Sequence, residues 1–277
     1  MSATLTATPE TTAAPAPKPT YKVTFGRVLR SEGSKFLSLR SSWITLAVGL
    51  FFLAFVGIMV AYRYNPADLH GPAADSRDAI DISLKGVELS QLALGVLGVL
   101  ATAGEYTTGL IRSTFAAVPK RLPVLWTKCL VLFGAAIVVA TAGAFISFVG
   151  GENFLHGKAI ALTLSSSGVL RCLFGAGLYL ALVTVFGAAL GMLVRSVAGG
   201  IALLVGIMML LPVFLDMLPS SWKTDVAPYL PGTAGQSIYS LHTAPGALSS
   251  GTGLWVFVAW VAAALIGAAY RVVRSDS

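Results

Sequence analysis

The chain has 277 residues, of which 56% are hydrophobic and only 11% are charged, and its formal net charge is +7. This balance excludes an ordinary soluble domain, in which about a quarter of the residues are charged. The basic residues lie at the ends of apolar runs without the interleaved aromatic residues of a nucleic-acid surface, so we expect no nucleic-acid partner. The composition predicts an all-α protein of the lipid bilayer.

The N-terminal region precedes the apolar runs. Residues 1–20 are rich in Thr, Ala and Pro with almost no large apolar side chains, which predicts a disordered cytosolic tail. Residues 21–42 place apolar positions at intervals of roughly three to four, typical of an amphipathic helix in the membrane interface. Glu32, Lys35 and Arg40 belong to this interfacial segment. A plain basic juxtamembrane segment is the alternative, because two glycines weaken the helix propensity.

Six apolar runs follow, each close to the length of about 20 residues that a helix needs to cross a bilayer. They define a six-span transmembrane domain over residues 43–274. The fourth and fifth runs are joined by two residues, Arg195 and Ser196, which predicts an antiparallel pair, and Gly187 and Gly191 allow a close helix approach. The predicted spans cover residues 43–62, 87–103, 125–149, 172–194, 197–218 and 254–270.

The distribution of Lys and Arg predicts the orientation of these spans. With the N-terminus inside, 13 of the 19 basic residues lie on the inner side and 6 on the outer side. Because basic residues favour the cytoplasmic side, we expect both termini to be cytoplasmic. Residues 219–253 are too apolar for a solvated outer loop and too rich in Pro and Gly for a span, so we expect short re-entrant or interfacial helices there.

The one sizeable polar loop on the predicted cytoplasmic side covers residues 104–121. Glu105 lies where an acidic side chain would complement a helix N-terminus, and a proline near the end would terminate the helix. We therefore predict a short, weakly amphipathic helix with Tyr106, Leu110 and Phe115 on its apolar side. The alternative is a turn whose basic residues only set the topology.

Neither a nucleotide site nor a metal site is predicted within the chain. Residues 151–158 resemble a phosphate-binding loop, but five residues rather than four separate the glycines, and Ala159 replaces the Ser or Thr that holds magnesium. An external metal site near Asp68 is the alternative, although the histidine spacing matches no zinc motif. The three histidines, all in predicted outer loops, are His70, His156 and His242.

Two stretches resemble the permease subunits of bacterial ABC-2 type transporters, and a third is similar to the final outer loop of that family. The first stretch, before the first span, contains Arg30-Ser31-Glu32, Lys35, Arg40 and Trp43; the second, after the second span, contains Glu105-Tyr106, Gly109, Arg112, Thr114 and Pro119; the third contains Tyr229-Leu230-Pro231.

This resemblance implies a permease of an exporter that moves an unidentified substrate across the bacterial cytoplasmic membrane. Residues 105–118 would form a coupling helix that contacts a separate ATP-binding cassette ATPase subunit. A second permease chain, identical or related, would complete a dimer. Because this chain has no phosphate loop, ATP and magnesium would be bound by the partner, and the chain itself would be neither an enzyme nor a cofactor protein. The expected coupling residues are Glu105, Tyr106, Gly109, Arg112 and Thr114.

An ion-coupled secondary transporter or channel is the alternative function. It would require ionisable groups near the bilayer midplane, or interrupted helices in matching halves of the chain. Glu88, Lys128 and Asp216 instead lie near the ends of predicted spans. We interpret Glu88 as interfacial and Lys128 as reaching the cytoplasmic head groups.

Overall fold

A computed structural model describes residues 24–65, 78–118, 121–217, 225–243 and 246–274. Within these ranges the chain forms helices and connecting turns and no β-strand. Six of the helices are long and apolar enough to cross a membrane, which confirms the predicted all-α fold with six candidate spans. The predicted tail, residues 1–20, lies outside the described residues.

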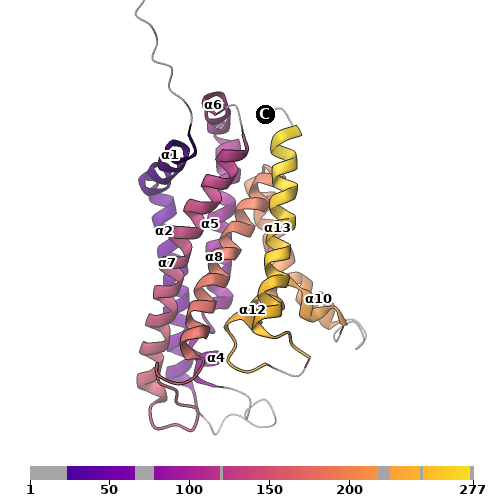
Figure 1. Ribbon diagram of the computed structural model, residues 1–277. Helices are drawn as coiled ribbons and strands as arrows, with labels where there is room; N and C mark the ends of the chain where they lie inside the picture. Colours follow the sequence, from indigo (N-terminus) through magenta and orange to yellow (C-terminus); the bar gives the residue numbers. More distant parts are fainter. Residues whose placement is uncertain (1–23, 66–77, 119–120, 218–224, 244–245, 275–277) are drawn as a thin grey trace, which may run out of the picture.

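The six long helices lie side by side as an elongated bundle (Figure 1). Most extend beyond their predicted ends, because a helix continues into polar residues after the apolar run stops. The longest, α7, has 34 residues and includes Gly151 of the loop-like sequence, so that stretch begins inside a helix. The six are α2 (Arg40–Arg63), α5 (Val87–Thr107), α7 (Leu122–Leu155), α8 (Val169–Val194), the Val197–Leu215 span and α13 (Ser250–Arg274).

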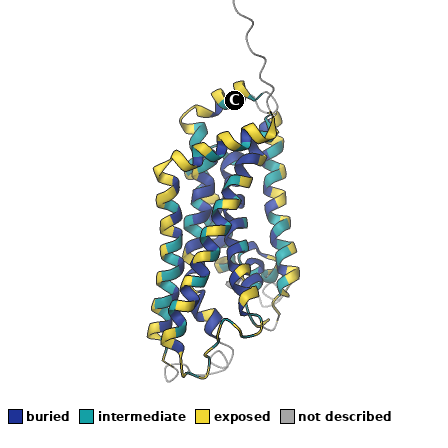
Figure 2. Cartoon of the chain, turned by 60° about the vertical axis from the view of Figure 1, so that its left-hand side comes forward, coloured by how far each residue is buried: buried dark blue, intermediate teal, exposed yellow. Residues whose placement is uncertain are grey.

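Helix α8 forms the centre of the bundle, and Figure 2 shows buried residues gathered along its middle. Small residues allow α5 to pack closely against it. A Cβ atom added at Gly187 would lie 2.1 Å from the Gly95 carbonyl oxygen, and one added at Gly191 would lie 2.4 Å from Thr102 Oγ1. Thr102 Oγ1 also donates a hydrogen bond to the Ala188 carbonyl at 2.9 Å. The close approach predicted from the two glycines of α8 is therefore confirmed.

The fifth predicted span, residues 197–218, forms a helix over Val197–Leu215, and this helix contains a π-helical turn that the sequence did not predict. It consists of α9 (Val197–Val205), the π-helical turn η2 (Gly206–Leu210) and α10 (Leu211–Asp216). Pro212 explains the change, because proline has no N–H to donate and its ring crowds the carbonyl of Met208 four residues earlier. The wider π turn accommodates this proline.

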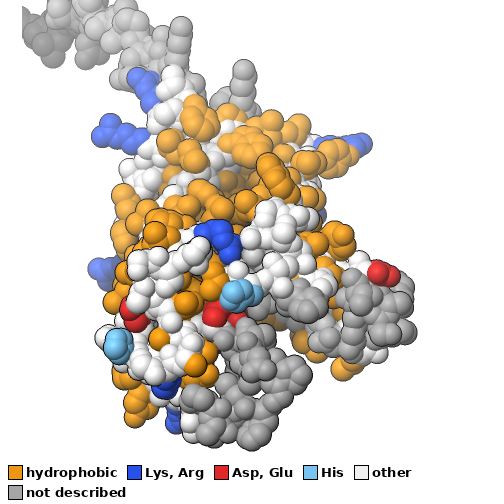
Figure 3. Space-filling view, turned by 60° about the horizontal axis from the view of Figure 1, so that its bottom comes forward, with side chains coloured by type: hydrophobic (Ala, Val, Ile, Leu, Met, Phe, Trp, Pro, Cys, Tyr) orange, Lys and Arg blue, Asp and Glu red, His pale blue; other side chains and the backbone are white. Residues whose placement is uncertain are grey.

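Short helices cover the end of the bundle opposite α1 and α6 (Figure 1). They are α4 (Ala79–Ser83), η3 (Ala227–Tyr229) and α12 (Pro231–Tyr239), and α12 packs against α8 and α13. The short helices predicted within 219–253 are thus present, and their depth in a membrane stays a prediction. Figure 3 shows acidic, basic and histidine side chains scattered among apolar ones on this end.

The other end carries α1 (Phe25–Ser38), α6 (Leu110–Ala117) and the C-terminus (Figure 1). The interfacial segment does contain a helix, and its location at a membrane surface stays a prediction. In α6 the buried residues are Ile111 and Phe115, four positions apart on one face. The predicted apolar face was wrong at Leu110, which is exposed.

Candidate functional site

Three helices meet at the ammonium group of Lys128, near the start of α7. Its Nζ atom lies 2.6 Å from Glu32 Oε2 of α1 and 2.8 Å from Glu105 Oε1 of α5. The side chains of Glu32, Lys128 and Glu105 are only 4%, 7% and 12% exposed, so water screens these charges weakly. Each charge is compensated mainly by its neighbours in the protein.

A second lysine extends this cluster to α6. Lys35 Nζ lies 2.7 Å from Glu32 Oε1 and 3.5 Å from Glu105 Oε1, and it donates a hydrogen bond of 3.2 Å to Thr114 Oγ1 of α6. We call Glu32, Lys35, Glu105 and Lys128 the charge network. It contains two acids and two bases, and it joins α1, α5, α6 and α7 without a net charge.

Glu105 occupies a different position in its helix from the one predicted. It lies in the last turn of α5, and the short helix begins at Leu110 instead. The boundary is set by Gly109, whose φ of +74° lies in the left-handed region that glycine adopts without a steric penalty. An acid near a helix C-terminus is unfavourable, but Lys35 and Lys128 compensate for it.

The expectation that Lys128 reaches outward to head groups was also wrong. Its side chain is buried in the bundle because Glu32 and Glu105 supply two carboxylates from other helices. Sequence reasoning missed Lys128 as a site residue. The available signal was a pair of isolated glutamates in segments that are otherwise basic.

Glu32 is ionised in this environment. Burial alone would raise the pKa of its carboxyl group, but the charge and hydrogen bond of Lys128, followed by those of Lys35, hold the pKa below the ordinary value of 4.5. The carboxylate therefore carries its charge at neutral pH, as the pairing with the two lysines requires.

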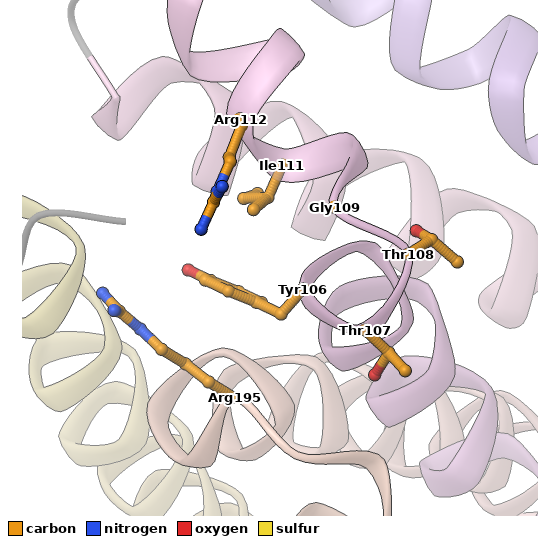
Figure 4. Close-up of a pocket in the computed structure, with 7 residues that line it drawn as sticks. All are labelled: Tyr106, Thr107, Thr108, Gly109, Ile111, Arg112 and Arg195. Atoms are coloured by element: carbon orange, nitrogen blue, oxygen red, sulfur yellow. The ribbon is translucent and has the colours of Figure 1, made fainter.

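A pocket of 360 Å³ is lined by residues from the end of α5, from α6 and from the end of α8 (Figure 4). Arg112 of α6 and Arg195, which follows α8, extend toward the side chain of Tyr106. The Arg195 guanidinium carbon lies 5.1 Å from the centre of the Tyr106 ring, a cation–π distance. The lining residues are Tyr106, Thr107, Thr108, Gly109, Ile111, Arg112 and Arg195.

The predicted coupling residues thus fall into two neighbouring groups. Glu105 and Thr114 contact the charge network, whereas Tyr106, Gly109 and Arg112 line the pocket. The predicted interfacial residues Glu32 and Lys35 belong to the network, but Arg40 belongs to neither group and is exposed at the first residue of α2.

Arg195 is a second site residue that sequence reasoning missed. It ends α8 in the left-handed conformation, with φ of 60°, and its guanidinium donates a 3.2 Å hydrogen bond to the Arg271 carbonyl of α13. The sequence did contain a signal for Arg195, because it lies in the two-residue connection between two predicted spans. So short a connection keeps the side chain near the helix ends.

The remaining candidates from the sequence lie far from this site. Glu88 is exposed at the start of α5 and pairs with Lys85 at 2.7 Å, and its location at a membrane interface stays a prediction. The described part of the chain contains no group of three or more His, Cys, Asp or Glu residues that could hold a metal ion. His70 and Asp68 lie outside the described residues.

No protein-family model and no curated protein matches this chain. The structure alone supports a broad class, a helical membrane protein with six candidate spans. The function is inferred from the site and from the sequence resemblance.

Proposed function

We propose that the chain is the transmembrane permease subunit of an ABC-2 type exporter in a bacterial cytoplasmic membrane. The observation that supports this proposal most is the charge network, because it links the short helix α6 to spans α5 and α7 and to α1. A force applied to α6 by another protein would reach the spans through these contacts.

Helix α6 has the two faces that a coupling helix needs. Ile111 and Phe115 anchor it on the bundle, while Leu110, Arg112 and Ser113 are exposed. In the proposed mechanism, ATP-driven closure of two ATPase subunits displaces the exposed face, and α5 and α7 carry this displacement into the bilayer as alternating access. ATP and magnesium are bound by the partner, and this chain contributes no catalytic residue.

A dimer with a second permease chain completes the proposed transporter. The bundle is close-packed where α5 meets α8: a Cβ atom at Gly98 would lie 2.0 Å from the Thr184 carbonyl oxygen. This packing favours a substrate pathway between two chains over a pathway through one. The substrate is unspecified in this proposal.

The distribution of charge favours this function over an ion-coupled transporter. Among the described residues, the charged residues of the spans lie near the helix ends. Lys128 lies farther along its helix from the nearest end than the others do, and its charge is neutralised within the charge network. An ion-coupled carrier would need such groups along its pathway.

Affinity capture tests the proposal. The tagged chain is purified from its native membrane in mild detergent, and bound soluble proteins are identified by mass spectrometry. We expect a phosphate-loop ATPase to be captured in near-equal amount and to be lost in the variants Leu110→Asp and Arg112→Glu. The control variant is Arg63→Glu, which changes an arginine at the end of the bundle opposite α6 and should retain the ATPase. In membrane vesicles, Arg112→Glu should insert normally but lose ATP-driven transport.

Two results would contradict the permease proposal. One is the absence of any ATPase from the purified chain in several detergents. The other is capture of the ATPase that is unchanged in both α6 variants, since the exposed face of α6 would then have no role in coupling.

A further inference from the structure

An aspartate faces a histidine on the end of the bundle opposite α1 and α6, where Figure 3 shows a histidine beside acidic side chains. Asp78 precedes α4, and its side chain is only 10% exposed. One carboxylate oxygen, Oδ1, accepts a 2.9 Å hydrogen bond from the Asp81 N–H and so caps α4. The other oxygen, Oδ2, is buried and has no hydrogen-bond partner among the described residues. A buried acceptor without a donor is unfavourable, so a donor that reaches this oxygen would stabilise this end of the molecule.

His242, on the segment that follows α12, carries the donor that faces this oxygen. Its Nε2 atom lies 3.7 Å from Asp78 Oδ2, beyond hydrogen-bond distance but within the reach of an ion pair. The imidazole is 72% exposed, so it exchanges protons with water. A neutral imidazole has one N–H, whereas a protonated one has two and carries a positive charge. Protonation therefore places a charged donor on the atom that faces the carboxylate.

Arg171 of α8 holds the histidine segment in place. Its guanidinium donates hydrogen bonds to the Ile238 carbonyl at 3.3 Å and to the Ser240 carbonyl at 2.8 Å, which fixes the chain two residues before His242. The fold thus positions the imidazole beside the carboxylate. A side-chain movement of about 1 Å would bring the pair to the ordinary length of a charge-assisted hydrogen bond.

Several other charged or titratable groups surround this pair on the neighbouring elements. None of those described donates a hydrogen bond to Asp78 Oδ2. Helices α2 and α7 approach α4 at Ser83, through the uncharged residues Gly57 and Ser147. Histidine is the only side-chain type here that ordinarily changes its charge between about pH 5 and 8. The surrounding groups are Asp81 of α4, Lys85 and Glu88 near the start of α5, Arg171 and Cys172 of α8, and Tyr239 of α12.

We propose that the contact between Asp78 and His242 is a pH-sensitive switch. Protonated His242 closes on Asp78 and holds the segment after α12 against the start of α4, and loss of the proton releases that segment. The stabilisation is present below about pH 6 and is lost as the pH rises toward about 8, because the carboxylate stabilises the charged form of the imidazole. The inference goes beyond the proposed transport role. It depends neither on an ATPase nor on which side of the membrane this end faces.

Thermal unfolding of the purified full-length chain at pH 5.5 and at pH 8 tests the switch. His242→Gln removes the titrating group, and His242→Lys supplies a cation that is charged at both pH values. Asp78→Asn removes the carboxylate charge but keeps an oxygen that can cap α4. His156→Gln, which changes another exposed histidine that follows α7, is the matched control.

We expect His242→Gln to lower the unfolding temperature by roughly 2–4 °C at pH 5.5 and to have little effect at pH 8. His242→Lys should match the unchanged protein at pH 5.5 and exceed its unfolding temperature at pH 8, where the native histidine has lost its proton. In the Asp78→Asn background, His242→Gln should have no further effect at either pH. His156→Gln should unfold as the unchanged protein does at both pH values.

Four outcomes would overturn the inference. An effect of His242→Gln that is absent, or equal at the two pH values, would show that protonation does not strengthen the contact. The same loss in the Asp78→Asn background would show that His242 has a different partner. An equal, pH-dependent loss in His156→Gln would indicate a general effect of histidine charge. If Asp78→Asn does not fold, the two His242 variants decide, since equal losses in His242→Gln and His242→Lys at pH 5.5 would exclude an ionic contact.

Discussion

Lys128 is the residue on which the charge network depends most. Its side chain is 7% exposed, whereas that of Lys35 is 37% exposed, so water can replace Lys35 more easily than Lys128. Removing one partner of a buried ion cluster leaves an uncompensated charge, and the cost exceeds that of losing a surface pair.

We expect Lys128→Met to lower the free energy of unfolding by about 3 kcal/mol, because Glu32 and Glu105 stay buried with one cation fewer. Adding Glu32→Gln should recover part of this loss, since Lys35 and Glu105 then balance each other. Thermal unfolding of the purified protein in detergent measures both effects.

The matched control for this prediction is Lys85→Met, which removes an ion pair whose two side chains are 46% and 53% exposed. This variant should unfold close to the temperature of the unchanged protein. A combined Lys128→Met and Glu32→Gln variant that is less stable than Lys128→Met alone would show that the unbalanced carboxylate is not the cause.

Among the elements, α5 and α8 make one of the close contacts of the bundle. At Gly98 of α5 an added Cβ atom would lie 2.0 Å from a backbone carbonyl oxygen of α8, whereas Gly134 of α7 has open space within 4 Å. Both glycines lie inside helices, so the same substitution tests packing at one position and helix propensity at the other.

We expect Gly98→Ala to destabilise the protein by about 1–3 kcal/mol, because the two helices must separate to accept a methyl group. Gly134→Ala should be neutral or stabilise by up to about 1 kcal/mol, because alanine favours the helix. Thermal unfolding of both variants in one detergent checks the pair. Equal changes in both would contradict the packing explanation.

The long helices and the close approach at Gly187 and Gly191 were predictable from the sequence, while the ionic contacts between helices were not. Apolar runs specify a spanning helix by themselves, whatever surrounds them. The start of α6 was misplaced because Glu105 fits a helix N-terminus in isolation and gains its real partners only from α1 and α7. Lys128 and Arg195 escaped prediction for the same reason: their roles depend on side chains that lie far away in the sequence.

For the whole molecule, the predicted orientation in the membrane is directly testable. Ser113 on α6 and Ser165 between α7 and α8 are both exposed and lie at opposite ends of the bundle. The native thiols, Cys129 and Cys172, are buried and can be replaced by alanine.

In that background, we expect a membrane-impermeant maleimide added to intact cells to label Ser165→Cys but not Ser113→Cys, because basic residues favour a cytoplasmic location for the end with α6. Ser113→Cys should be labelled only after the membrane is permeabilised. Labelling of Ser113→Cys in intact cells would reverse the orientation.

The charge network also divides into two halves that are each electrically balanced. Glu32 and Lys35 belong to α1 and pair with each other at 2.7 Å, while Glu105 and Lys128 belong to the bundle and pair at 2.8 Å. Helix α1 can therefore leave the bundle without stranding an unpaired ion on either side. Separation of α1 would break the 2.6 Å contact between Glu32 and Lys128 and would expose Val28 and Phe36, but it would create no net charge on either side.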